Sequence, residues 1–215
     1  MPKGAPKIKV KAVKGYGAKV YLCDNNEKSR EETCNNIIQK TNANFIHPFD
    51  NEDVICGQAT CAKEIYDTTN DLDFIMCPVG GGGLASGTVL STKLFSSRTK
   101  VVLAEPLNAS DAYESFTKKT LIPVQSPNTI ADGLKTSLSE RTFNIILNGA
   151  SNIITVTEEE IISAMRLIWE RLKIVCEPSC SVPLAALLKK PKEFKNKKVV
   201  IILTGGNVDV QKLPF

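Results

Sequence analysis

Four consecutive glycines, Gly80, Gly81, Gly82 and Gly83, stand between an apolar run at residues 74–77 and a stretch of helical length at residues 84–95. Because glycine has no Cβ, the backbone N–H groups of such a turn can converge on an anion, and the N-terminus of the following helix adds partial positive charge. A plain tight turn also uses glycine, but four in a row after a buried strand favour a phosphate site. The sequence therefore predicts a strand, a phosphate-binding glycine turn (residues 80–83) and a helix.

The same alternation of strand and helix continues along the chain. Helical lengths and patterns predict helices at residues 26–40, 53–66, 84–95 and 158–172, the last with Thr157 as N-cap and Glu160 at the capping-box position. Apolar runs predict buried parallel strands at residues 20–22, 74–77, 101–104, 153–156 and 199–203. This order predicts an α/β fold with a mostly parallel, twisted sheet and flanking helices.

Two segments are less regular. Residues 8–11 alternate like a strand, although Pro6 suits the start of a helix, and the sequence leaves both open. Residues 119–128, with Pro123 and Pro127, are the clearest loop.

Composition and charge narrow the functional classes. At 215 residues and 42% hydrophobic content the chain can bury a substantial core, and it contains no apolar run near the ~18 residues of a membrane span. Without a signal-like apolar segment we expect a cytoplasmic protein, and its seven cysteines are expected to be reduced thiols. The six lysines of the first 20 residues favour a solvated face over a nucleic-acid or membrane surface, since they lack a series of interleaved aromatic residues.

The residues alone leave two phosphate ligands open. Gly80, Gly82 and Ala85 fit the spacing of a dinucleotide fingerprint, and Glu105 follows the next strand where a ribose-binding acid belongs, which suggests an NAD-binding domain. A second glycine turn, Thr204-Gly205-Gly206-Asn207, follows the last strand and instead suits a small phosphorylated ring held between two turns.

Several motifs in one order are more specific. The chain contains PVGGGGL at residues 78–84, AEPLNASD at 104–111, TIADGLKTS at 129–137, WERLK at 169–173, EPS at 177–179 and LTGGNVD at 203–209. This series resembles the serine racemase and serine/threonine dehydratase family of pyridoxal-phosphate (PLP) enzymes. The resemblance implies PLP fold type II, truncated at the N-terminus, with a remnant of the small domain at residues 1–45 and the large PLP-binding domain at 46–215. It implies racemisation or β-elimination of serine or threonine, and a homodimer.

The resemblance also implies site residues. In the family the glycine turn and Leu84 bind the PLP phosphate, and Thr204 matches the hydroxyl residue that hydrogen-bonds the pyridine nitrogen. A neutral hydroxyl partner weakens the ring as an electron sink but remains compatible with elimination and racemisation. Arg30 and Thr136 match substrate-side positions. Phe49 stands where animal racemases carry Asn and where dehydratase-like members carry an aromatic residue. The resemblance therefore does not decide between a racemase and a dehydratase.

A cation and a nucleotide are implied as well. Glu105, Asp111 and the carbonyl of Ala109 match a Mg²⁺ or Ca²⁺ loop, with Asp73 as a further contact, whereas without the resemblance two acids six residues apart are an ordinary solvated loop. The residues that match an ATP effector site in animal racemases are Tyr16, Lys173 and Asn207.

The family's catalytic motifs are missing from these 215 residues. Neither a Ser-x-Lys-x-Arg-Gly motif, which carries the Schiff-base lysine, nor the Ser-x-Gly-Asn-His loop for the substrate carboxylate occurs, and no catalytic residue is therefore assigned. Lys3, Lys7 and Lys9 are expected to be surface lysines rather than replacements. We expect a chain that is inactive alone, with a non-catalytic truncated paralogue acting through a full-length partner as the alternative.

Overall fold

A parallel four-stranded sheet forms the centre of the computed structural model, which describes residues 1–215 apart from the side chain of Glu27. The strands have the order β3-β2-β1-β4, and Phe74 is in register with Lys100 on one side and Val199 on the other. The bounds are β1 Phe74–Pro78, β2 Lys100–Pro106, β3 Ala150–Val156 and β4 Val199–Ile201. The predicted fold class is confirmed.

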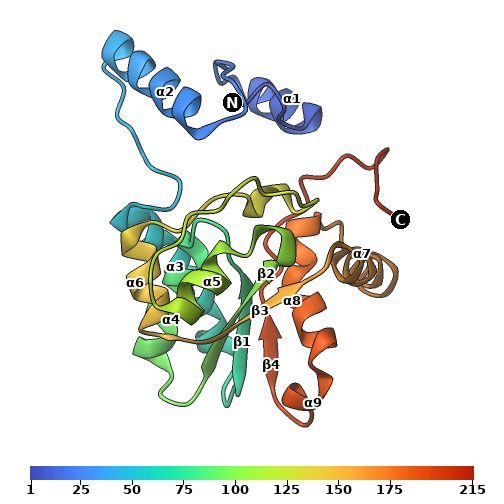
Figure 1. Cartoon of the computed structure of the whole chain (residues 1–215). Helices are drawn as coiled ribbons and strands as arrows, with labels where there is room; N and C mark the ends of the chain where they lie inside the picture. The colour runs from blue at the N-terminus through green and yellow to red at the C-terminus, as the bar shows by residue number, and fades with distance from the viewer. The chain divides into compact units, whose positions relative to one another are not determined.

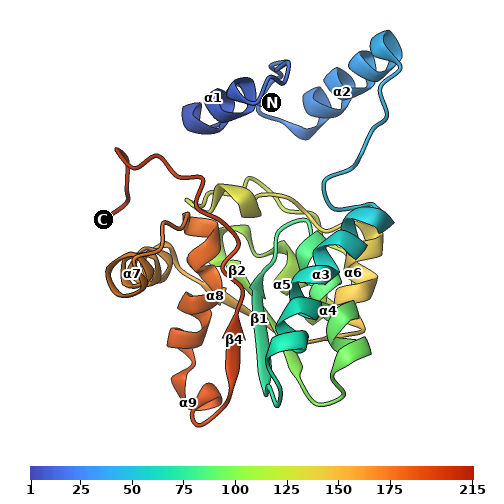
Figure 2. The same cartoon turned by 180° about the vertical axis from the view of Figure 1, so that it is seen from behind.

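Helices cover both faces of the sheet, as Figure 1 and Figure 2 show from opposite sides. One face carries α3 Glu52–Thr68, α4 Gly83–Phe95, α5 Asp111–Lys118 and α6 Glu140–Leu147, and the other α7 Glu158–Leu167, α8 Pro178–Lys189 and α9 Pro191–Phe194. Side chains alternate along β1, so that Ile75 and Cys77 pack in the first layer and Met76 in the second. All three are fully buried, which explains the uninterrupted apolar run in the sequence.

The chain divides into two compact units. The smaller unit contains Met1–Ile46 and Asn207–Leu213, and the larger contains His47–Gly206 and Pro214–Phe215. The smaller unit has two helices, α1 Lys7–Gly15 and α2 Glu27–Thr41, the second capped by the Asn26 side chain. This division falls one residue after the boundary expected from the sequence, but residues 207–213, which were expected in the large domain, belong to the smaller unit.

Several local predictions need correction. Residues 20–22 form no strand in the described chain, where the nearest pairing is an isolated bridge between Pro2 and Cys23. A run of three residues without a partner strand cannot form a ladder, and Leu22 is 57% exposed. Residues 8–11 lie in α1, so the helical alternative was right.

Further differences concern helices. The helix expected at 158–172 begins at the Thr157 capping box as predicted, but its last turn, Ile168–Leu172, is a π-helix. Helices α5, α6, α8 and α9 were not predicted. Helix α8 was not predicted because Pro178 and Pro183 are residues that usually interrupt helices. Pro178, however, occupies the first turn, where a missing N–H costs nothing.

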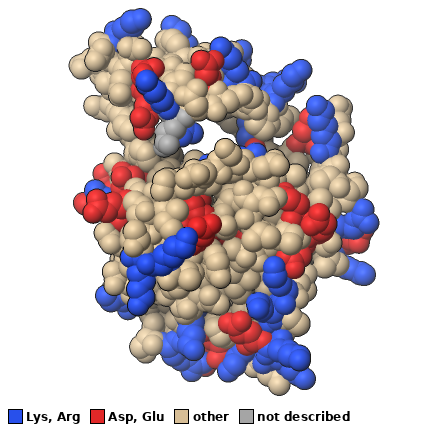
Figure 3. Space-filling view, viewed as in Figure 1, with Lys and Arg blue, Asp and Glu red and all other residues tan. Residues whose placement is uncertain are grey.

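Basic and acidic side chains are interspersed on the face drawn in Figure 3. None of the helices that the structure describes has the length and apolar character needed to cross a membrane.

Candidate functional site

The glycine turn lies at the carboxyl end of β1 and leads directly into α4. Gly82 is the N-cap of α4 with φ of 90°, a left-handed conformation that favours glycine, and no side chain caps this helix among the described residues. The first N–H groups of a helix have no acceptor within the helix. The turn therefore presents unsatisfied donors and the positive end of the helix dipole.

Packing excludes side chains from the turn. A Cβ on Gly81 would lie 2.3 Å from Cδ1 of Phe49, and one on Gly82 would lie 2.8 Å from Cβ of Thr142. The Thr142 hydroxyl also donates a hydrogen bond of 3.0 Å to the carbonyl of Gly81. The turn is thus held from behind while its N–H groups remain available to a ligand.

A cavity of about 400 Å³, called here the glycine cavity, opens beside this turn. This volume lies in the range of small-molecule sites. The structure brings the glycine turn, Leu84, Thr136 and Thr204 together around it, as a site built from both glycine turns requires. The remaining lining residues are Pro48, Phe49, Gln58, Pro78, Ala85, Gly133, Leu134, Glu177 and Ser179.

Sequence reasoning did not assign Gly133, Glu177 and Ser179 to the site, although they belong to motifs it singled out. The hydroxyl of Ser179 accepts a hydrogen bond of 3.1 Å from the N–H of Gly133, which joins the loop before α6 to the start of α8. The available signal was that Gly133 lies in the TIADGLKTS motif and Glu177 and Ser179 in the EPS motif, because neither motif follows a strand directly in the chain.

Two buried carboxylates stand at the end of β2. Glu105 is 1% exposed and Asp111 is 4% exposed, so the reading as an ordinary solvated loop is wrong. The oxygens of Glu105 accept hydrogen bonds from the N–H groups of Ala112 and Tyr113, at 3.0 and 2.9 Å, and thereby cap the start of α5. One oxygen of Asp111, Oδ2, is buried and has no hydrogen-bond partner among the described residues.

The electrostatic environment of these acids is unfavourable to charge. Burial, together with the nearby Asp111, raises the pKa of Glu105 well above its ordinary value, against the effect of the two N–H donors. Burial also raises the pKa of Asp111 to about 7, although N–H groups including that of Leu138 oppose the shift. A divalent cation bound beside these two buried acids would stabilise their charged forms.

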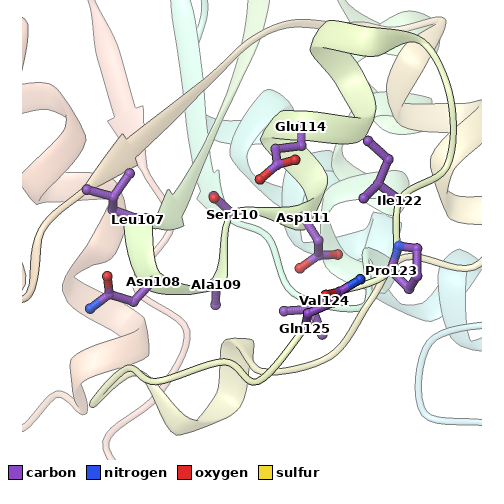
Figure 4. Close-up of a pocket in the computed structure, with 10 residues that line it drawn as sticks. All are labelled: Leu107, Asn108, Ala109, Ser110, Asp111, Glu114, Ile122, Pro123, Val124 and Gln125. Atoms are coloured by element: carbon purple, nitrogen blue, oxygen red, sulfur yellow. The ribbon is translucent and has the colours of Figure 1, made fainter.

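A second cavity of about 380 Å³, the carboxylate cavity, adjoins Asp111. Figure 4 shows the side chain of Asp111 between Ala109 and the segment at residues 122–125, which forms the opposite wall. Asp73 does not join this group. It precedes β1 and its carboxylate accepts the N–H of Lys198 at 2.9 Å, at the opposite end of the sheet and ~20 Å of strand length from Glu105.

The other predicted site residues are distributed over both units. Arg30 lies on α2 of the smaller unit and Thr136 in the larger one. Tyr16, 88% exposed, and Asn207 belong to the smaller unit, and Lys173 belongs to the larger unit, where it ends the π-helix with φ of 58°.

Comparison with known proteins shows which protein family the chain matches. Residues 1–205 match the family model described as pyridoxal-phosphate dependent enzyme. The chain is 44% identical over its whole length to the beta-hydroxyaspartate dehydratase of Paracoccus denitrificans, and it covers 68% of that protein. It is 45% identical to the serine racemase of Dictyostelium discoideum, with 99% of the chain and 67% of the relative covered.

The solved structures agree with this match. The structure of maize serine racemase superposes with a TM-score of 0.94 at 34% identity, over 98% of this chain and 65% of the maize chain. The chain thus spans about two thirds of the length of these relatives. Between the two phosphate ligands that the sequence left open, the family match favours PLP over NAD.

Proposed function

The chain belongs to the family of pyridoxal-phosphate-dependent enzymes, and on that premise we propose that the glycine cavity binds PLP for racemisation or β-elimination of a β-hydroxy amino acid. Serine, threonine and hydroxyaspartate share the β-hydroxyl group, and the relatives are named as serine racemases and as a hydroxyaspartate dehydratase. The observation that carries the proposal is the uncapped start of α4 at the glycine turn, which faces the same cavity as Thr204.

The residues fit this cofactor chemically. The N–H groups of the glycine turn and Leu84 would hold the phosphate, and the Thr204 hydroxyl would orient the ring through its nitrogen. When bound, PLP supplies an electron sink that stabilises negative charge at the substrate Cα. Arg30 and Thr136 are the proposed substrate-side groups. Tyr16, Lys173 and Asn207 are proposed to bind an ATP effector, and the family's homodimer is the proposed assembly.

The phosphate part of this proposal predicts a ranking of ligands. The 215-residue chain should bind PLP at least ~10-fold more tightly than pyridoxal, which lacks the phosphate, because charged hydrogen bonds contribute ~1.5–3 kcal/mol. Isothermal titration calorimetry measures both affinities, and inorganic phosphate should compete with PLP. Equal affinities for PLP and pyridoxal would contradict a phosphate site at the glycine turn.

A single variant tests the ring contact separately. Thr204→Val keeps the shape of the side chain and should weaken PLP binding while leaving the affinity for inorganic phosphate unchanged. Thr117→Val, on the exposed face of α5, is the matched control and should change neither.

We propose further that Glu105, Asp111 and the carbonyl of Ala109 bind Mg²⁺ or Ca²⁺, with water completing the shell. The unpartnered Oδ2 of Asp111 and the burial of both acids support this assignment. Asp73 is left out of this site because of its position at the far end of the sheet.

The cation proposal predicts a thermal shift. Millimolar Ca²⁺ or Mg²⁺ should raise the Tm of the chelator-treated chain by several degrees, since saturation ~100-fold above Kd stabilises by ~2.7 kcal/mol. Asp111→Asn should abolish the shift, and Glu114→Gln, on the wall of the same cavity, should retain it. Differential scanning fluorimetry provides the measurement, and an equal shift in Asp111→Asn would rule out this ligand set.

A further inference from the structure

Two buried cysteines flank the start of α8 and have no part in the proposed function. Cys176 precedes the N-cap residue Glu177, and Cys180 lies in the first turn, where its N–H donates a hydrogen bond of 3.0 Å to the carbonyl of Glu177. This turn brings the two side chains together, and each thiol shifts the pKa of the other. Each is 1% exposed. Together they are called the thiol pair.

The second glycine turn packs directly on the thiol pair. The backbone N–H groups of Thr204 and Gly205 and the Thr204 hydroxyl lie beside the sulfur of Cys180, where they favour its thiolate form. The N–H of Glu177 donates to the carbonyl of Gly205 at 3.0 Å, and a Cβ on Gly206 would lie 2.2 Å from the carbonyl oxygen of Val175. One wall of the glycine cavity therefore rests on the two thiols.

From this arrangement we infer that Cys176 and Cys180 form a redox-active dithiol, which a hydroperoxide oxidises to an intramolecular disulfide. The Cys180 thiolate attacks the O–O bond of hydrogen peroxide, which gives a sulfenic acid and hydroxide. The thiol of Cys176 then attacks that sulfur, so that the S–S bond forms and the sulfenic OH leaves with the thiol proton as water. In total, two thiols and one peroxide give one disulfide and two waters.

The electrostatics of the thiol pair separate the two roles. The neighbouring Cys176 thiol and the N–H groups of Gly205 and Thr204 lower the pKa of Cys180, although burial opposes the shift. The hydrogen bond to Cys180, burial and the charge of Glu177 raise the pKa of Cys176, while Trp169 acts in the opposite direction. Cys180 is thus the nucleophile, and Cys176 remains the protonated thiol that resolves the sulfenic acid.

We expect the oxidant to enter from the glycine cavity, because its lining residues Glu177 and Ser179 are sequence neighbours of Cys176 and Cys180. Hydrogen peroxide is little larger than water and suits such a route. A buried thiol without these donors behaves differently: burial raises the pKa of Cys77 to about 12, which leaves it unreactive.

Peptide mapping tests the inference directly. The tryptic peptide of residues 174–189 contains Cys176 and Cys180 and no other cysteine. After a low dose of peroxide and alkylation of the remaining thiols, this peptide should have lost two hydrogens and resist alkylation, and dithiothreitol should reverse both changes. A peptide that remains a fully alkylated dithiol, while peptides with exposed Cys56 become oxidised, would overturn the inference.

Two single variants distinguish the nucleophile from its partner. Cys176→Ser should stop at a sulfenic acid on Cys180, which dimedone traps, whereas Cys180→Ser should not react at this peptide. For the wild type, the oxidation rate should level off at a lower pH than that of an ordinary cysteine with a pKa of ~8.5, because the surroundings of Cys180 favour its thiolate. Equal reactivity of the two variants would contradict the assigned roles.

The single tryptophan gives an optical readout. The indole Nε1 of Trp169 donates a hydrogen bond of 3.0 Å to the carbonyl of Cys176, so disulfide formation should change its fluorescence. A Cys56→Ser control should respond like the wild type. An unchanged signal after mapped oxidation would show that the backbone around Cys176 does not respond.

One consequence rests on the proposed function. Disulfide formation changes the position of Cys180, on which the second glycine turn packs, and should therefore shift Thr204 and weaken PLP binding by several-fold, reversibly with dithiothreitol. A disulfide that leaves PLP affinity unchanged would overturn this coupling. If the reduced chain binds no PLP at all, the proposed function fails, while peptide mapping without cofactor still decides on the thiol pair.

Discussion

The 215-residue chain, purified alone and supplied with PLP and L-serine, is expected to form pyruvate and D-serine at least ~1000-fold more slowly than a full-length relative. A positioned general base contributes ~10²–10⁴ to rate, and the family's lysine also holds the cofactor covalently. Neither the lysine motif nor the substrate carboxylate loop occurs within these 215 residues. The phosphate and ring contacts would remain, so weak cofactor binding without turnover is the expected state.

Coupled assays for pyruvate and D-serine measure this directly. Addition of a polypeptide that carries both missing motifs, in trans, should restore turnover if the glycine cavity is otherwise intact. The same polypeptide with its lysine changed to alanine is the matched control and should restore none. Turnover of the lone chain near that of a relative would show that some residue of this chain replaces the lysine.

Gly87→Ala is expected to destabilise the chain by about 3 kcal/mol, at the upper end for overpacking. Gly87 lies where α4 crosses α3, and an added Cβ would stand 2.5 Å from the nitrogen of Ala59 and 2.8 Å from the carbonyl oxygen of Ile55. These are backbone atoms, which cannot move without displacing the helix. Helix propensity alone would favour alanine by ~0.5–1 kcal/mol, so the steric cost decides the sign.

The matched control is Gly57→Ala on α3. A Cβ at Gly57 would meet no atom within 4 Å, so only the propensity gain of ~0.5–1 kcal/mol should remain. Denaturant titration monitored by circular dichroism measures both changes. A Gly87→Ala variant as stable as Gly57→Ala would show that the contact between α3 and α4 can relax.

The sequence predicted those elements whose cause is local. The run from Phe74 through the glycine turn to Phe95 has strand, turn and helix signals in adjacent residues, and the structure follows them closely. The Thr157 capping box likewise fixed the start of α7. By contrast, α8 carries an internal Pro183, and its burial between sheet and α7 overrides the local signal.

Some residues of the candidate site were predictable from local sequence, and others were not. The glycine turn and Thr204 could be identified because each lies in a motif of consecutive residues, and they line one cavity. The burial of Glu105 and Asp111 was not predictable from a loop-like segment, because it depends on α5 turning back toward β2 and on Leu138 approaching from a distant loop. Gly133 and Ser179 are 46 positions apart in the chain, and only the folded structure makes them neighbours.

The order of the strands leaves β3 and β4 at the margins of the described sheet, where open backbone groups can recruit a second chain into an aggregate. Lysine residues lie at both edge strands. Strand β4 has only three residues and follows Lys197 and Lys198, and the ammonium of Lys189 donates a hydrogen bond of 2.9 Å to the carbonyl of Thr155 in β3. We therefore expect these three lysines to hinder intermolecular strand pairing at both edges of the sheet.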